Sequence, residues 1–111
     1  MPFNGSDIRG KAKFTEDNNG STFILIELTG TNTQVHPAFI RFDNARDNGE
    51  NAITLNNCTC KISETLVTNL DNGNKINFDK LSRFNGHIAI LASKTDNTVV
   101  GVANIGINLN Q

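Results

Sequence analysis

Four side chains of this 111-residue sequence have the chemistry to bind soft metal ions: His36, His87, Cys58 and Cys60. Imidazole nitrogens and thiolate sulfurs are common ligands of zinc and copper. One residue separates the two cysteines, so on a strand their side chains would point the same way. A disulfide across one residue is strained in an extended chain. We therefore expect two free thiols, with a redox pair, or a copper or zinc site shared with the histidines, as alternatives.

Each histidine also has a purely structural interpretation. His36 precedes Pro37 in "VHPAFIRF", where we expect it to hydrogen-bond a loop. His87 lies in "GHIAI", where we expect an exposed or half-buried strand residue.

The segment "DNARDNGE" gathers the carboxylates of Asp43, Asp47 and Glu50 around a glycine. Carboxylate oxygens are calcium ligands, but the spacing departs from the EF-hand loop, where ligands recur at every second position. We expect a solvated turn, with a calcium-dependent surface or adhesive domain as an alternative.

Several functional classes lack support in the sequence. No grouping suggests a nucleophile with its base, and no glycine-rich loop opens a helix to hold phosphate, so we expect no enzyme. The formal net charge is −1 with 19% charged residues, which argues against nucleic-acid binding. No apolar run approaches the ~20 residues that span a bilayer. The first residues also lack the apolar centre of a signal peptide.

Short apolar runs alternate with Asn-, Asp- and Gly-rich turns such as "EDNNGS" and "LDNGNK". This pattern indicates a β-sandwich or barrel. The expected strands are "IRGKAKFT", "STFILIELTG", "PAFIRFD", "NAITLN", "ISETLVTNL", "GHIAILAS" and "TVVGVANIGINL". One short helical turn is expected near residues 77–84, capped by Asn77. The length fits a single domain over residues 1–111.

The alternation also predicts which side chains share the core. Lys11 and Lys13 should face water, because they alternate with apolar neighbours. The expected core residues are Ile24, Ile26, Leu28, Ile40, Ile88, Ile90, Val100 and Val102.

Several segments together resemble chordin-type (CHRD) domains, in the same order along the chain. The most specific are "VHPAFIRF" and "VVGVANIG", accompanied by "ELTG", "FNGHIAI" and the "DNG" turn at 71–73. That family is similar in fold to the copper–zinc superoxide dismutases. The resemblance implies an all-β Greek-key sandwich of about seven to eight antiparallel strands, of the dismutase or immunoglobulin type.

The resemblance also implies where metal ligands would lie. The family's His-x-His pair falls at Phe39 and Arg41, and a further histidine falls near Leu91 or Ala92. Phenylalanine and the aliphatic residues offer no donor atom, and arginine is a permanent cation. Only His36 matches, at the position preceding the pair. We therefore expect no metal, no cofactor and no dismutase activity.

The resulting functional expectation is a non-catalytic, extracytoplasmic binding or structural module. Its partner would be an unidentified protein or glycan, and the chain itself would be monomeric. Phe39 and Arg41 form the expected contact surface. We expect the helical crossover to cover Phe39, and Arg41 to pair with Asp43 or Glu64. Restoring histidines at both positions would then give at most weak copper binding, because a third ligand is missing.

Overall fold

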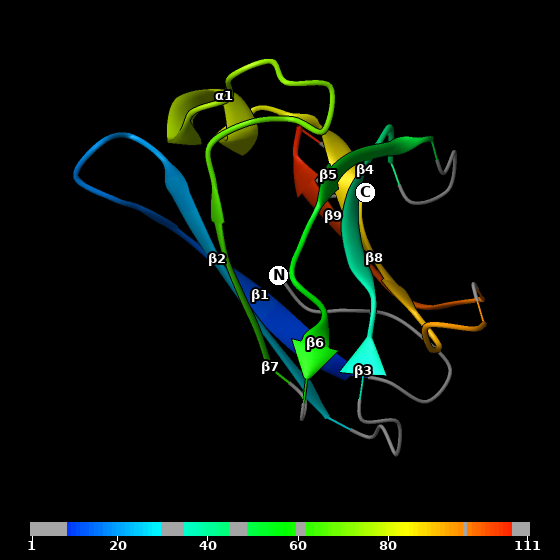
Figure 1. The fold of residues 1–111 in the computed structure, drawn as a ribbon. Helices are drawn as coiled ribbons and strands as arrows, with labels where there is room; N and C mark the ends of the chain where they lie inside the picture. The colour runs from blue at the N-terminus through cyan, green and yellow to red at the C-terminus, as the bar shows by residue number, and fades with distance from the viewer. Residues whose placement is uncertain (1–8, 30–34, 45–48, 60–61, 97, 108–111) are drawn as a thin grey trace.

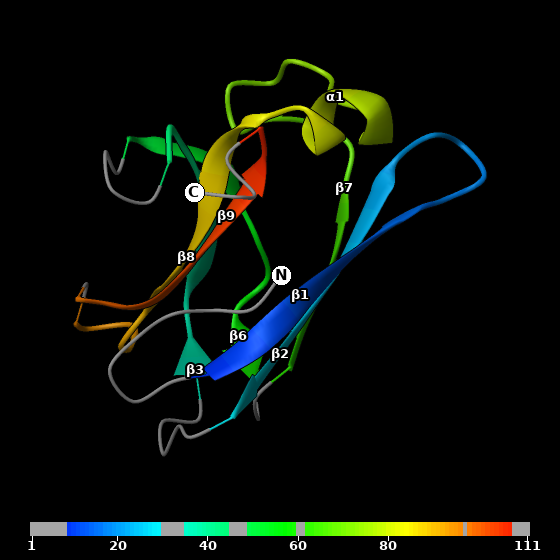
Figure 2. The same ribbon diagram turned by 180° about the vertical axis from the view of Figure 1, so that it is seen from behind.

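The computed structural model describes residues 9–29, 35–44, 49–59, 62–96 and 98–107. They form two antiparallel sheets and one short helix, which confirms the expected all-β sandwich (Figure 1 and Figure 2). Sheet A contains, in spatial order, β1 (Arg9–Glu16), β2 (Thr22–Thr29), β7 (Ile62–Val67), β6 (Cys58–Thr59) and β3 (Val35–His36). Sheet B contains β5 (Asn51–Thr54), β4 (Ala38–Phe42), β8 (Asn85–Leu91) and β9 (Val99–Gly106).

The order of the strands is that of an immunoglobulin-type Greek-key sandwich. Strands β1, β2, β7 and β6 occupy the places of A, B, E and D, and β5, β4, β8 and β9 those of C′, C, F and G. Strands β4 and β8 are therefore central neighbours in sheet B, although the chain passes through sheet A between them.

All seven expected strands are present, and two strands of two residues each, β3 and β6, were not expected. Strand β3 ends at His36 in sheet A, and β4 begins at Ala38 in sheet B. Pro37 stands between them. Because proline has no backbone N–H to donate to a ladder, it suits a point where the chain leaves one sheet for the other.

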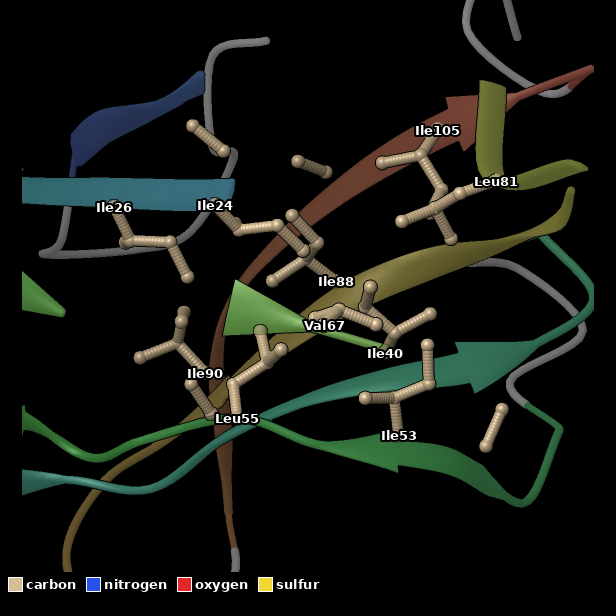
Figure 3. Close-up of a cluster of buried hydrophobic side chains, with 14 of the residues drawn as sticks. Ile24, Ile26, Ile40, Ile53, Leu55, Val67, Leu81, Ile88, Ile90 and Ile105 are labelled. Carbon is tan, nitrogen blue, oxygen red and sulfur yellow. The ribbon is translucent and has the colours of Figure 1, made fainter. Parts of the chain in front are cut away.

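The inner faces of the two sheets enclose one hydrophobic core, in which the labelled side chains of Figure 3 converge from both sheets and from the helix. Lys11 and Lys13 are exposed, as expected. Six of the eight expected core residues are buried: Ile24, Ile26, Leu28, Ile40, Ile88 and Ile90.

The expectation for β9 was wrong. Val102 is only half-buried and Val100 only packs against the core edge, whereas Ala103 and Ile105 are buried. Both faces of this strand are apolar, so alternation did not decide which one faces inward. On β8, Ile88 lies opposite Ala103, so a large inward side chain is matched by a small one. Such pairing of large with small side chains is one way in which protein cores reach close packing.

The expected helical turn is α1 (Phe78–Ser82), which closes one end of the sandwich (Figure 1). Asn77 caps it, because its Oδ1 accepts a hydrogen bond from Lys80 N at 2.8 Å. Leu81 is its buried residue. Among the described residues, no helix has the length and apolar character needed to cross a membrane.

Candidate functional site

The outer face of sheet B carries the positions at which the chordin-type resemblance implies ligands. Ile40 is completely buried, whereas its neighbours Phe39 and Arg41 are half-buried and point the other way. In the register of the sheet, Arg41 lies opposite His87 and Phe39 lies opposite Ala89. The outward orientation expected for Phe39 and Arg41 is therefore confirmed.

Phe39 and Arg41 contact each other on this face. The Arg41 guanidinium carbon lies 5.9 Å from the centroid of the Phe39 ring, within the range of a cation–π contact. Arg41 Nε also donates a hydrogen bond to Asn51 Oδ1 at 2.8 Å. The expected pairing with Glu64 is wrong, because Glu64 lies on β7 in the other sheet. We refer below to the side chains of Phe39, Arg41 and Asn51 as the Phe39–Arg41 surface.

Leu81 and Phe84 do not provide the expected cover over Phe39. The crossover places Leu81 in the core, and the ring of Phe84 packs against Phe42 with centroids 5.6 Å apart. Helix α1 lies at the end of the sandwich, where it approaches β9. It therefore covers the open end of the core rather than the outer face of sheet B.

Leu91 and Ala92 contribute backbone groups rather than ligands. Leu91 is buried, and its carbonyl oxygen accepts a hydrogen bond from His36 Nδ1 at 2.8 Å. Ala92 N donates to Thr98 O at 2.9 Å, between β8 and β9. His36 is itself only 2% exposed. His36 therefore has the expected structural role, but it bonds to the end of strand β8 rather than to a loop. The bond joins β3 of sheet A to β8 of sheet B.

We expected His87 to be exposed or half-buried, but its side chain is completely buried. It lies on β8, which is flanked by β4 and β9 in sheet B. Its Nδ1 donates to the carbonyl oxygen of Asp43 at 2.9 Å. Its Nε2 is buried and has no hydrogen-bond partner among the described residues. Burial lowers the pKa of His87 below its ordinary 6.5, and the nearby charge of Arg41 adds to this effect, while the bond to Asp43 opposes it.

The low pKa of His87 predicts a loss of stability in mild acid. Below about pH 6.5 the unfolded chain binds a proton at this imidazole, while the folded chain binds it only at lower pH. The free energy of unfolding should therefore fall as the pH drops below about 6.5. Urea denaturation across this range measures it, and His87→Gln should flatten the dependence. An unchanged dependence in that variant would contradict the assignment to His87.

Cys58 is a buried free thiol in the core. Burial raises the pKa of Cys58 to about 11, against a smaller opposing effect of its hydrogen bond with Ser63. Cys58 lies directly opposite His36 in the β3–β6 pair. Cys60, the second cysteine of the expected pair, lies outside the described residues.

The burial of Cys58 predicts a thiol that reacts only after unfolding, because the thiolate is the nucleophile and is scarce at neutral pH. A disulfide-exchange reagent should leave Cys58 unmodified in native protein. In denaturant without reductant, both Cys58 and Cys60 should react, and peptide mass analysis can assign each. Finding no reactive thiol in the denatured chain would instead support a bridged pair.

Two of the three candidate calcium ligands lie in the described part of the β4–β5 hairpin. Asp43 has a left-handed backbone (φ 68°), and its backbone N–H and carbonyl bond to Asn85 and His87 respectively. Glu50 accepts a backbone bond from Phe42 N at 2.9 Å. Asp47 lies outside the described residues. Within the described ranges, no three His, Cys, Asp or Glu side chains are grouped closely enough to hold a metal ion.

Sequence reasoning missed that His87 lies beside Arg41 on the outer face. The spacing within each strand was visible, but the pairing of β4 with β8 depends on a register that joins segments far apart in the chain. His36 and His87 do not converge, because His36 bonds to Leu91 at one end of β8 and His87 lies four residues away near the other end, roughly 13 Å by strand rise.

Comparisons with family models, with curated proteins and with solved structures find no match to this chain. The chordin-type resemblance therefore stays a prediction, and the Phe39–Arg41 surface is the candidate functional site.

Proposed function

We propose that this chain is a non-catalytic, metal-free β-sandwich module that binds an extracytoplasmic protein or glycan through the Phe39–Arg41 surface. The extracytoplasmic setting and the kinship with chordin-type domains rest on the sequence resemblance alone. The binding surface rests on the arrangement of side chains on sheet B.

One observation carries the proposal: a half-buried aromatic ring and an arginine in contact occupy the centre of a sheet face where the resemblance implies metal ligands. Aromatic and arginine side chains are enriched among the residues that dominate binding energy at interfaces. Arginine also donates several hydrogen bonds from a rigid plane, and an aromatic ring stacks on the apolar faces of sugars and side chains. The bond from Arg41 to Asn51 holds the guanidinium in place before any partner arrives.

The proposal is tested by screening labelled protein against an array of glycans and an array of extracellular protein domains. Phe39→Ala and Arg41→Ala should each weaken the strongest interaction by about tenfold or more, as expected of residues at the centre of an interface. Lys11→Ala, an exposed change on the other sheet, is the matched control and should leave binding unchanged.

A partner whose affinity is the same for the Phe39→Ala and wild-type chains would contradict this surface. Metal analysis of protein purified without an affinity tag tests the second part of the proposal. A stoichiometric content of copper or zinc would refute the metal-free assignment.

A further inference from the structure

A cleft of about 360 Å³ opens beside α1, away from the Phe39–Arg41 surface. Three segments line it: the β1–β2 turn at residues 19–21, residues 68–69 just after β7, and residues 75–77 with Lys80 at the start of α1. Figure 2 shows this turn and α1 at the same end of the sandwich. The volume falls in the lower part of the range for small-molecule sites.

Backbone hydrogen bonds fix the walls of the cleft. Phe78 N donates to Gly20 O at 2.8 Å and so ties the start of α1 to the β1–β2 turn. Ile76 N donates to Thr68 O at 3.1 Å across the opposite side. A ligand would therefore meet groups that are already ordered, and it would lose little affinity to the ordering of loops.

Of the described residues that line the cleft, Lys75 and Lys80 are the ones with ionisable side chains. The nearby carboxylates have other partners: Asp17 accepts from the N–H groups of Asn19 and Ser21, both at 2.9 Å, and Asp79 pairs with Arg83. Among the described residues, no carboxylate forms an ion pair with either lysine. Two lysines without a described carboxylate partner therefore line the cleft.

The remaining lining is rich in carboxamides and hydroxyls. The cap bond to Lys80 N occupies Asn77 Oδ1, which leaves the Asn77 amide group to donate. Asn19 provides another carboxamide at the turn, and Ile76 is the one large apolar side chain among the described lining residues. A site with this lining suits a ligand that is anionic and polar rather than apolar or aromatic.

We propose that this cleft binds a small polyol that carries an oxyanion, such as a sugar acid or a sugar phosphate. Lys75 and Lys80 hold the anionic group, and the carboxamides of Asn19 and Asn77 bond the hydroxyls. The proposal is independent of the Phe39–Arg41 surface, so either site can fail its test without the other.

The test is a titration of the backbone amide NMR spectrum with four probes: glucuronate, glucose 6-phosphate, glucose and inorganic phosphate. The two acidic sugars should shift the amide signals of residues 19–21 and 75–80. The one with the higher affinity shows whether the cleft prefers a carboxylate or a phosphate. Glucose alone should bind weakly because it lacks the anionic group, and inorganic phosphate should bind weakly because it lacks the sugar hydroxyls. Inorganic phosphate that binds as tightly as glucose 6-phosphate would overturn the proposal.

Variants then assign the contacts. Lys75→Ala and Lys80→Ala should each lower the affinity for the more tightly bound acidic sugar by about tenfold. This is the loss expected for one charge-assisted hydrogen bond. Lys94→Ala removes an exposed lysine outside the cleft, and it should leave the affinity unchanged while controlling for net charge. An equal loss in all three variants would indicate nonspecific attraction and would overturn the proposal.

Discussion

Replacing Phe39 and Arg41 together by histidine should create a copper- or zinc-binding site that neither single replacement creates. Residues 39 and 41 face the same way on β4, and His87 lies directly opposite position 41 on β8. Opposite residues of an antiparallel pair have Cβ atoms about 5 Å apart. Three imidazoles would then share one face, and the buried Nε2 of His87 has no hydrogen-bond partner among the described residues. We therefore expect His87 to act as the third ligand in this variant, which revises the expectation of at most weak copper binding.

Isothermal titration with Cu²⁺ and Zn²⁺ measures this gain. The double variant should bind one ion per chain, and adding His87→Ala should abolish that binding. Replacing His36 instead should leave the gained binding intact, because His36 bonds near the far end of β8 at Leu91. Metal binding that survives His87→Ala would show that His87 is not a ligand of the engineered site.

Leu28→Ala should lower the free energy of unfolding by about 2–5 kcal/mol, the usual loss when a buried leucine is truncated and a cavity remains. Leu28 is 2% exposed and belongs to the core cluster between the sheets. Since small domains have a total stability of about 5–15 kcal/mol, this is a large fraction of it. Denaturant unfolding followed by circular dichroism measures the change.

Leu66→Ala is the matched control, because it removes the same atoms from a side chain that is 54% exposed on the outer face of sheet A. Its cost should stay within about 0.5 kcal/mol, as for most surface substitutions. Equal losses in the two variants would mean that the inner and outer faces of β2 and β7 have been assigned wrongly.

The strands could be predicted because each depends on local alternation and on turn residues. Lys11, Ala12 and Lys13 alternate between water and the core, and the β1 register follows that alternation. In β9, Val102 and Ala103 are both apolar, so only the side chains of β8 decide which of them points inward. The two-residue strands β3 and β6 escaped prediction because their pairing within sheet A joins residues far apart in the chain and carries no local pattern.

The candidate site was predicted less completely than the fold. The outward direction of Phe39 and Arg41 followed from strand periodicity. The burial of His87 did not, because it depends on strands β4 and β9 lying on either side of β8. The contact of Phe84 with Phe42 rather than Phe39 likewise depends on where α1 closes the sandwich.

The strand order has a consequence for how the chain is made. Strand β4 lies between β5 and β8 in sheet B. The backbone groups of β4 that pair with β8 therefore have no partner strand until β8 has left the ribosome. The β1–β2 hairpin can form from local contacts, but its apolar inner face has no complete sheet to pack against at that stage. Folds dominated by such distant pairings fold slowly, and their exposed strands are prone to aggregate. Nascent chains of this protein should therefore expose unpaired strand edges and apolar surface until β9 is synthesised.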